Sequence, residues 1–167
     1  MKRIWSPWRS RHVERLASNP NAVRGVFASI ANGDSDERNL VLWRGKHVFV
    51  LMNLYPYNSG HLLIVPYREI ADYERLDPEE RAEIAEVTAQ CISWLRETLK
   101  PDGFNVGMNL GSAGGAGVPE HLHVHVVPRW AGDTNFMPVT GETKVIPESV
   151  RDTYLKLQKV VQRHDSP

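Results

Sequence analysis

Three histidines alternate with aliphatic residues in one short stretch of the chain. His121, His123 and His125 lie within VPEHLHVHVVPRW, which spans residues 118–130. Side chains of a β-strand alternate between its two faces, so a strand here would place all three imidazoles on one face, ~6.5–7 Å apart. Near neutral pH an imidazole can act as a nucleophile, a proton carrier or a metal ligand. The row is therefore a candidate reactive site.

The row admits three interpretations. The histidines could be ordinary polar residues of a surface strand. They could bind zinc, although three alternate positions of one straight strand converge poorly on a tetrahedral ion, and the chain has few other suitably spaced ligands. They could also include a nucleophile that attacks phosphorus and forms a covalent intermediate.

A glycine-rich segment directly before the histidines favours the third interpretation. Residues 110–119 read LGSAGGAGVP, and the four glycines allow backbone N–H groups to approach an anion closely. The segment is not a Walker loop, because it lacks Gly-Lys-Ser/Thr and runs into a predicted strand rather than a helix. Alone it could be a flexible connector. Beside an imidazole row it predicts a phosphate-binding loop next to a nucleophile.

The elements that position these residues follow from hydrophobic patterning. Strands are predicted at residues 40–44, 47–52, 61–65, 104–110 and 121–127, and helices at residues 78–99 and 148–163. The long helix has Asp77 as a suitable N-cap, Pro78 at its first position and Glu80 three residues after the cap. Strands interrupted by one long helix indicate an α+β domain, with an antiparallel sheet, that helix and a C-terminal helix.

Length and charge narrow the class of protein. The chain has 167 residues, which fits a single domain over 1–167, with an N-terminal arm over 1–20 and a C-terminal tail and helix over 138–167. Its 20 basic residues balance 20 acidic ones, which argues against binding nucleic acid or a membrane through bulk charge. The single cysteine, Cys91, excludes an intramolecular disulfide. With no signal segment or apolar spanning run, we expect a cytoplasmic protein.

The quoted motifs resemble the histidine triad superfamily of nucleotidyl hydrolases and transferases. The segment from His121 to Val127 resembles the family signature, and NLYPYNSGHLLIVP resembles the segment leading to a fourth histidine, here His61. GFNVGMNLG resembles the strand before the phosphate loop, and together these motifs cover residues 38–137. WSPWR, EHLHVHVVPRW and GDTNFM are similar to the branch that contains bacterial diadenosine tetraphosphate phosphorylases, also called ATP adenylyltransferases.

The resemblance implies a role for each histidine. His123 matches the nucleophile that attacks the α-phosphorus and becomes a nucleotidyl-imidazole. His121 and His61 match positions that orient the nucleophile and its hydrogen bonds. His125 matches the position that contacts the α-phosphate and assists the leaving group.

The resemblance also implies nucleotide contacts outside the histidines. These are Asn53 for the ribose, Asn109, Gly115, Ala116 and Gly117 for phosphates, and Trp130 and Asn135 for the distal nucleotide or the acceptor. Many family members carry glutamine four residues before the first histidine, where this chain has Gly117. The missing amide side chain leaves the second acceptor open between phosphate and water.

The implied activity is nucleotidyl transfer on a dinucleoside polyphosphate, with phosphorolysis of diadenosine tetraphosphate to ATP and ADP through a nucleotidyl-histidine. The alternatives are hydrolysis of dinucleoside polyphosphates or adenosine phosphoramidates, and a slow nucleotide-binding regulatory module. We expect inorganic phosphate as the second substrate and a homodimer, without a nucleic acid or membrane partner. We expect no protein-bound metal or other cofactor, while a divalent cation accompanies the polyphosphate.

Overall fold

The computed structural model describes residues 25–135 and 145–165, so the predicted N-terminal arm lies outside the described residues. Its centre is a five-stranded antiparallel sheet in the order β1-β2-β3-β5-β4. The strands are β1 (Val41–Arg44), β2 (Val48–Met52), β3 (Leu62–Pro66), β4 (Gly103–Met108) and β5 (Val124–Arg129). The helices are α2 (Val26–Ala31), α3 (Asp36–Asn39), the 3-10 turn η2 (Tyr73–Arg75), α4 (Pro78–Leu99) and α6 (Val150–Asp165). The predicted α+β class is confirmed.

Helix α4 has the bounds that the sequence predicts. Asp77 and Glu80 form a reciprocal capping box, in which the Asp77 backbone N–H donates to Glu80 Oε2 at 2.8 Å. This box satisfies backbone N–H groups that the first turn leaves without intrahelical partners, and Pro78 has no N–H to satisfy. The helix ends at Leu99, and the C-cap residue Lys100 takes a left-handed conformation with φ of 49° before Pro101.

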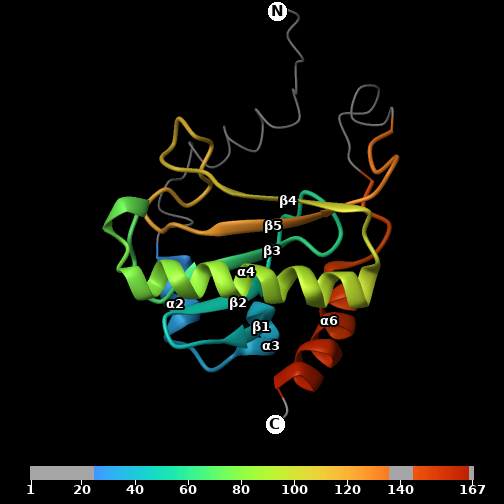
Figure 1. Cartoon of the computed structure of the whole chain (residues 1–167), viewed down its shortest axis with the longest axis horizontal. Coiled ribbons are helices and arrows are strands. Elements are labelled where there is room, and N and C mark those ends of the chain that lie inside the picture. Colours follow the sequence, from blue (N-terminus) through green and yellow to red (C-terminus); the bar gives the residue numbers. More distant parts are fainter. Residues whose placement is uncertain (1–24, 136–144, 166–167) are drawn as a thin grey trace, which may run out of the picture.

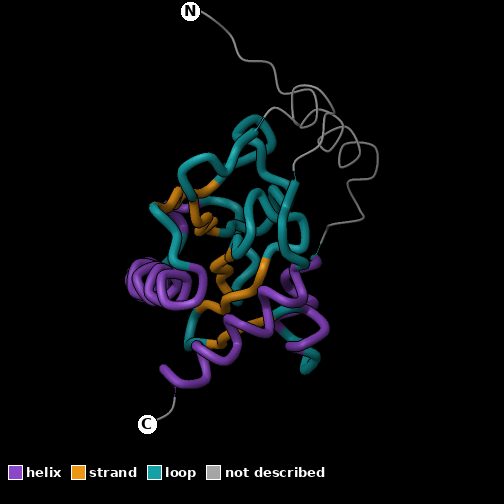
Figure 2. The backbone as a smooth tube through the Cα atoms, turned by 90° about the vertical axis from the view of Figure 1, so that its right-hand side faces the viewer, coloured by secondary structure: helices purple, strands orange, loops and turns teal. Residues whose placement is uncertain are grey.

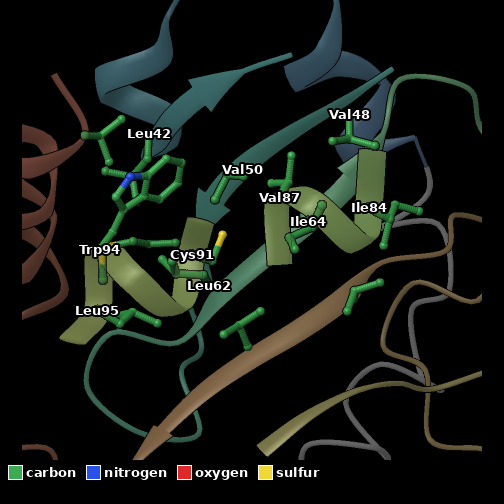
Figure 3. Close-up of a cluster of buried hydrophobic side chains, with 14 of the residues drawn as sticks. Leu42, Val48, Val50, Leu62, Ile64, Ile84, Val87, Cys91, Trp94 and Leu95 are labelled. Atoms are coloured by element: carbon green, nitrogen blue, oxygen red, sulfur yellow. The ribbon is translucent and has the colours of Figure 1, made fainter. Parts of the chain in front are cut away.

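One face of the sheet is closed by α4. Val50 and Ile64 of the strands lie beside Val87 of the helix, with Cys91 close to Val50, and all four side chains are buried (Figure 3). Figure 1 shows α4 crossing the sheet with α6 beside it, and Figure 2 shows α4 nearly end-on at one side of the strands. No helix within the described ranges is long and apolar enough to cross a bilayer.

The opposite face carries a second, smaller apolar cluster. Its buried members are Phe27 of α2 and the strand residues Val41, Phe49, Leu51, Leu63 and Val65. Because strand side chains alternate, these residues point away from α4. Helix α2 therefore covers the face that α4 does not.

Helices α2 and α3 are absent from the sequence prediction, because six and four residues are too few to show a helical period. A side chain of β1 holds both in place. The Arg44 guanidinium donates to the carbonyls of Ile30 at 2.9 Å and Ala31 at 3.1 Å, and to Asp36 Oδ1 at 2.7 Å. The last carbonyls of a helix lack intrahelical partners, so Arg44 caps α2 from the sheet.

Strand β5 begins three residues later than predicted, at Val124 rather than at residue 121. The preceding backbone is bonded elsewhere: the Leu122 N–H donates to the Ile70 carbonyl at 2.7 Å, and the His121 N–H to the Val118 carbonyl at 3.3 Å. Of the three alternating histidines, only His125 therefore lies within the strand. Strand β4 ends at Met108, two residues earlier than predicted.

Candidate active site

Strands β3 and β5 bring together two histidines from distant parts of the chain. His61 directly precedes β3, and His125 of β5 pairs with Leu63. Val124 and Val126 belong to the cluster beneath α4, so His125 points to the opposite face of the sheet. His61 Nε2 lies 2.9 Å from His125 Nδ1, and both side chains are buried.

A backbone group decides which nitrogens of this pair carry protons. The Tyr57 N–H donates to His61 Nδ1 at 3.0 Å. Because a backbone N–H can only donate, Nδ1 holds a lone pair, and neutral His61 carries its proton on Nε2. That proton is donated to His125 Nδ1, so neutral His125 carries its own proton on Nε2. His125 thus has an Nε2–H donor.

His123 has the opposite tautomer. Its Nδ1 lies 2.9 Å from the carbonyl oxygen of His121, and a carbonyl can only accept, so Nδ1 carries the proton and Nε2 the lone pair. The His123 and His125 ring centroids lie 4.9 Å apart. A nitrogen lone pair and an N–H donor therefore occupy neighbouring rings, which is the pairing that nucleophilic attack with assisted departure requires.

His121 is fixed by the neighbouring strand. Its Nε2–H donates to the Pro66 carbonyl at 2.8 Å, and its carbonyl holds His123. Its buried Nδ1 has no hydrogen-bond partner among the described residues. Main-chain carbonyls thus fix the rings of both His121 and His123.

Burial keeps these imidazoles uncharged. Desolvation, reinforced by the neighbouring rings of His125 and His123, lowers the pKa of His61 to about 3. Desolvation also lowers the pKa of His123 and of His121, and in each case a hydrogen bond to a carbonyl partly opposes it. The neutral imidazole is the nucleophilic form, so His123 is competent at neutral pH.

Two aromatic rings flank the imidazole row, and the sequence interpretation assigns neither of them to the site. The Phe27 ring centroid lies 5.2 Å from that of His123, and Tyr57 stacks on His125 at 5.5 Å with an interplanar angle of 21°. Tyr57 belongs to the NLYPYNSGH motif, which indicated a turn but not a ring contact. Phe27 reaches the site because Arg44 holds α2, and no local pattern indicates that contact.

The predicted phosphate loop is closed on itself. The Ala116 N–H donates to the Gly111 carbonyl at 3.2 Å and the Gly115 N–H to the Ser112 carbonyl at 3.0 Å. The Asn109 amide nitrogen lies 3.3 Å from the Gly115 carbonyl. These two backbone amides could contact a phosphate only by exchanging their present hydrogen bonds.

Glycine is required at one position of this loop. A Cβ on Gly114 would lie 2.3 Å from the Leu110 carbonyl oxygen, which is backbone and cannot yield easily. Gly117 is half-buried at the end of the loop. It occupies the position where many family members carry glutamine.

The remaining predicted contacts lie in different places. Asn53 is beside the histidines: its Oδ1 accepts the Tyr55 N–H at 2.9 Å, and its amide nitrogen lies 3.4 Å from His61 Nδ1. Trp130 and Asn135 follow the end of β5, at the opposite end of that strand from His123. Asn53 is thus brought to the site, while the other two lie past the far end of the strand.

The hydrogen bonds also bear on the zinc interpretation. His61 and His121 use their Nε2–H groups as donors, so these two nitrogens have no lone pair to offer a metal ion beside that of His123 Nε2. Within residues 25–135 and 145–165, no group of three or more His, Cys, Asp or Glu side chains is arranged to hold a metal ion.

The chain is similar in sequence to several known proteins. The HIT domain model matches residues 35–132. The AP-4-A phosphorylase of Mycobacterium tuberculosis (strain ATCC 25618 / H37Rv) is 44% identical over 158 residues, 92% of this chain and 80% of that protein. The Bis(5'-adenosyl)-triphosphatase of Saccharomyces cerevisiae (strain YJM789) is 32% identical over 94 residues, 54% of this chain and 44% of that protein.

A solved structure gives the same result for the fold. The crystal structure of a zinc-bound histidine triad family protein from Mycobacterium smegmatis has a TM-score of 0.68 and 26% sequence identity, covering 84% of this chain and 94% of that one. The resemblance stated from the motifs is confirmed, and the chain belongs to the HIT domain family.

Proposed function

We propose that this chain is a nucleotidyltransferase that phosphorolyses diadenosine tetraphosphate to ATP and ADP. The observation that carries the mechanism is the pair of opposite tautomers, with a lone pair on His123 Nε2 beside an N–H on His125 Nε2. The 44% identity with the M. tuberculosis AP-4-A phosphorylase supports the choice of substrate and acceptor.

The first step forms a covalent adduct. The His123 Nε2 lone pair attacks the α-phosphorus, the bond from this phosphorus to the bridging oxygen breaks, and ATP departs with that electron pair. His125 Nε2–H donates to the departing oxygen. The His123 ring gains positive charge as the P–N bond forms, which strengthens its Nδ1–H bond to the His121 carbonyl in the transition state.

The second step regenerates the nucleophile. An oxygen of inorganic phosphate attacks the same phosphorus, the P–N bond breaks, and the electron pair returns to His123 Nε2. The attacking phosphate becomes the β-phosphate of ADP. Water in the same position would give AMP, which is why the acceptor needs a direct test.

The proposal assigns no protein-bound cofactor to the reaction. The nucleophile and the proton donor are both side chains of this chain. The His121 carbonyl orients His123, and the Nε2–H of His61 orients His125. A divalent cation would enter with the polyphosphate as part of the substrate.

The proposal includes a homodimer formed through β4. Among the described strands, β1 and β4 are the sheet edges, and α3 and α6 pack on β1. Strand β4 exposes Asn105, Val106 and Gly107. An open edge strand readily pairs with another strand. Light scattering in solution should give twice the 19.0 kDa mass of one chain, and a monomer of wild type would contradict this assembly.

Labelled phosphate tests the proposed reaction. The purified chain is mixed with diadenosine tetraphosphate, with and without ³²P-labelled inorganic phosphate. We expect ATP and ADP in equal amounts, only when phosphate is present, with the label in the β-phosphate of ADP. AMP and ATP formed without phosphate would show a hydrolase, and tight binding without turnover would show a regulatory module.

A further inference from the structure

Asp133 lies in the GDTN segment that follows β5, and the proposed reaction leaves it without a role. We propose that Asp133 is a positioning residue for the histidine protons: through Asn58 it holds the Tyr57 N–H against His61, which keeps a proton on Nε2 of His125. This inference rests on the proposed function in one respect, namely that His125 assists the leaving group.

The buried Asp133 carboxylate is the centre of a polar cluster that reaches the surface at Arg129. Its side chain is 8% exposed and receives both Nε and Nη2 of Arg129, at 2.6 Å and 2.8 Å. It also accepts the Asn58 Nδ2–H at 2.8 Å and the Trp130 N–H at 3.2 Å. A bidentate arginine with two further donors fixes a buried carboxylate in one orientation.

Asn58 connects this cluster to the histidines. Its side chain is buried, and Nδ2 donates to both Asp133 Oδ2 and the Pro128 carbonyl, the latter at 3.1 Å. Its own carbonyl accepts the His61 N–H at 3.2 Å. The loop between β2 and β3 is thus tied to the end of β5, across 75 positions of the sequence from Asn58 to Asp133.

The neighbouring residue, Tyr57, provides the N–H that sets the tautomer of His61. If the loop left this position, His61 Nδ1 would lose the Tyr57 donor at 3.0 Å and keep only the more distant Asn53 amide at 3.4 Å, so it could carry the proton itself. Its Nε2 would then accept from His125 Nδ1, and His125 Nε2 would be left with a lone pair in place of its hydrogen. Because burial holds the pKa of His61 near 3, the ring stays neutral and the tautomer changes instead.

Asp102 provides a matched control, because it holds the same turn from the side of β4. Its Oδ2 accepts the Ala131 N–H at 2.7 Å, and its N–H donates to the Arg129 carbonyl at 2.9 Å. Its bonds to this turn reach neither Asn58 nor Tyr57. Asp102→Asn therefore perturbs the turn without acting on the histidines.

Histidine-ring ¹⁵N NMR reads the proposed effect directly. In wild type and Asp102→Asn we expect His61 and His125 as Nε2–H tautomers. In Asp133→Asn and Asn58→Ser we expect a second population with the proton on Nδ1. Two substitutions are used so that a folding failure of one leaves the other. A folded variant of either kind with wild-type tautomers would overturn the inference.

Leaving-group chemistry gives a second readout that general damage would not reproduce. The phenyl and p-nitrophenyl esters of AMP have similar size. Phenolate is a much more basic leaving group than p-nitrophenolate, so its departure depends more on proton donation from His125 Nε2–H. In Asp133→Asn the first-turnover burst of phenol should slow ~100-fold and that of p-nitrophenol less than ~3-fold, with little change in KM. Equal slowing of both esters, or slowing of neither, would overturn the positioning role.

The esters also separate this inference from the proposed function. They contain one nucleotide, and the burst requires neither phosphate nor a second nucleotide. A wild-type protein that releases both phenols but leaves diadenosine tetraphosphate intact would contradict the proposed substrate, while the comparison of Asp133→Asn with Asp102→Asn would still decide the role of Asp133.

Discussion

The two faces of the sheet use alternate residues of the same strands but are closed in different ways. The 22-residue helix α4 lies across one face, where Cys91 and Leu95 are fully buried among apolar side chains. The six-residue helix α2 contributes Phe27 to the other face, where β5 presents His125. From this difference we infer separate roles: the α4 face provides stability, and the opposite face holds the proposed reactive groups on rigid strands.

Removing the proposed nucleophile should have the largest effect on activity and little effect on stability. In His123→Ala we expect kcat for tetraphosphate phosphorolysis to fall at least ~10³-fold, because this removes the Nε2 lone pair that lies beside the Nε2–H donor of His125. The melting temperature should change little. His164→Ala, an exposed histidine of α6, is the control and should keep full turnover. Substantial turnover by His123→Ala would contradict the covalent mechanism.

A substitution on the α4 face should have the reverse effect. Leu95 is fully buried, so Leu95→Ala should reduce the free energy of unfolding by about 3 kcal/mol in urea titrations. The folded fraction should retain its kcat, since the residue lies away from the histidines. Leu155→Ala, on an exposed position of α6, should cost less than ~0.5 kcal/mol. A large loss of kcat in Leu95→Ala would contradict the view that the α4 face contributes only to stability.

Acid should reduce the free energy of unfolding through the buried histidines. The pKa values of His61, His121 and His123 are all lowered from the ordinary value of 6.5. As pH falls below that value, the unfolded chain gains protons that the native histidines do not take up, so stability decreases. Each histidine contributes up to about 1.4 kcal/mol per pH unit until its native pKa is reached. Urea titrations between about pH 7 and about pH 5 measure this slope, and equal stabilities would contradict the burial argument.

The smallest effect concerns the start of α4. Asp77→Ala removes one half of the capping box and should reduce the free energy of unfolding by about 1 kcal/mol. No change in kcat is expected, because the cap lies on the stability face. Asp72→Ala, an exposed carboxylate outside the box, should change stability by less than ~0.5 kcal/mol. A matching loss in both variants would show that the cap has no specific role.

The secondary structure was predicted best where hydrophobic residues recur at regular spacing. Helix α4 has its predicted bounds, and the predicted histidine row faces away from the α4 cluster at His125. The predicted start of β5 at residue 121 was wrong. The Leu122 N–H instead donates to the Ile70 carbonyl, which belongs to a loop distant in sequence. Alternation in sequence cannot distinguish a paired strand from an extended segment bonded to a loop.

Long-range polar contacts were the part that could not be predicted. The Asp133 carboxylate reaches Asn58 across 75 positions, and Arg44 reaches the carbonyl of Ile30 at the end of α2 across 14. Such contacts depend on how the loops fold over the finished sheet, and a single sequence carries no period that reports them. The motif NLYPYNSGH indicated where the chain turns but not that its backbone would set a tautomer.

The main-chain groups at Tyr57, Pro66 and His121 have a consequence for mutational tolerance. The Tyr57 N–H and the carbonyls of Pro66 and His121 decide the proton positions. These are backbone groups, so the contacts do not depend on which side chain those three positions carry. A proline at position 66 is compatible with this role, since proline keeps its carbonyl. At position 57 a proline would remove the donor, because proline has no backbone N–H. Any other amino acid there would keep the N–H that sets the proton position of His61.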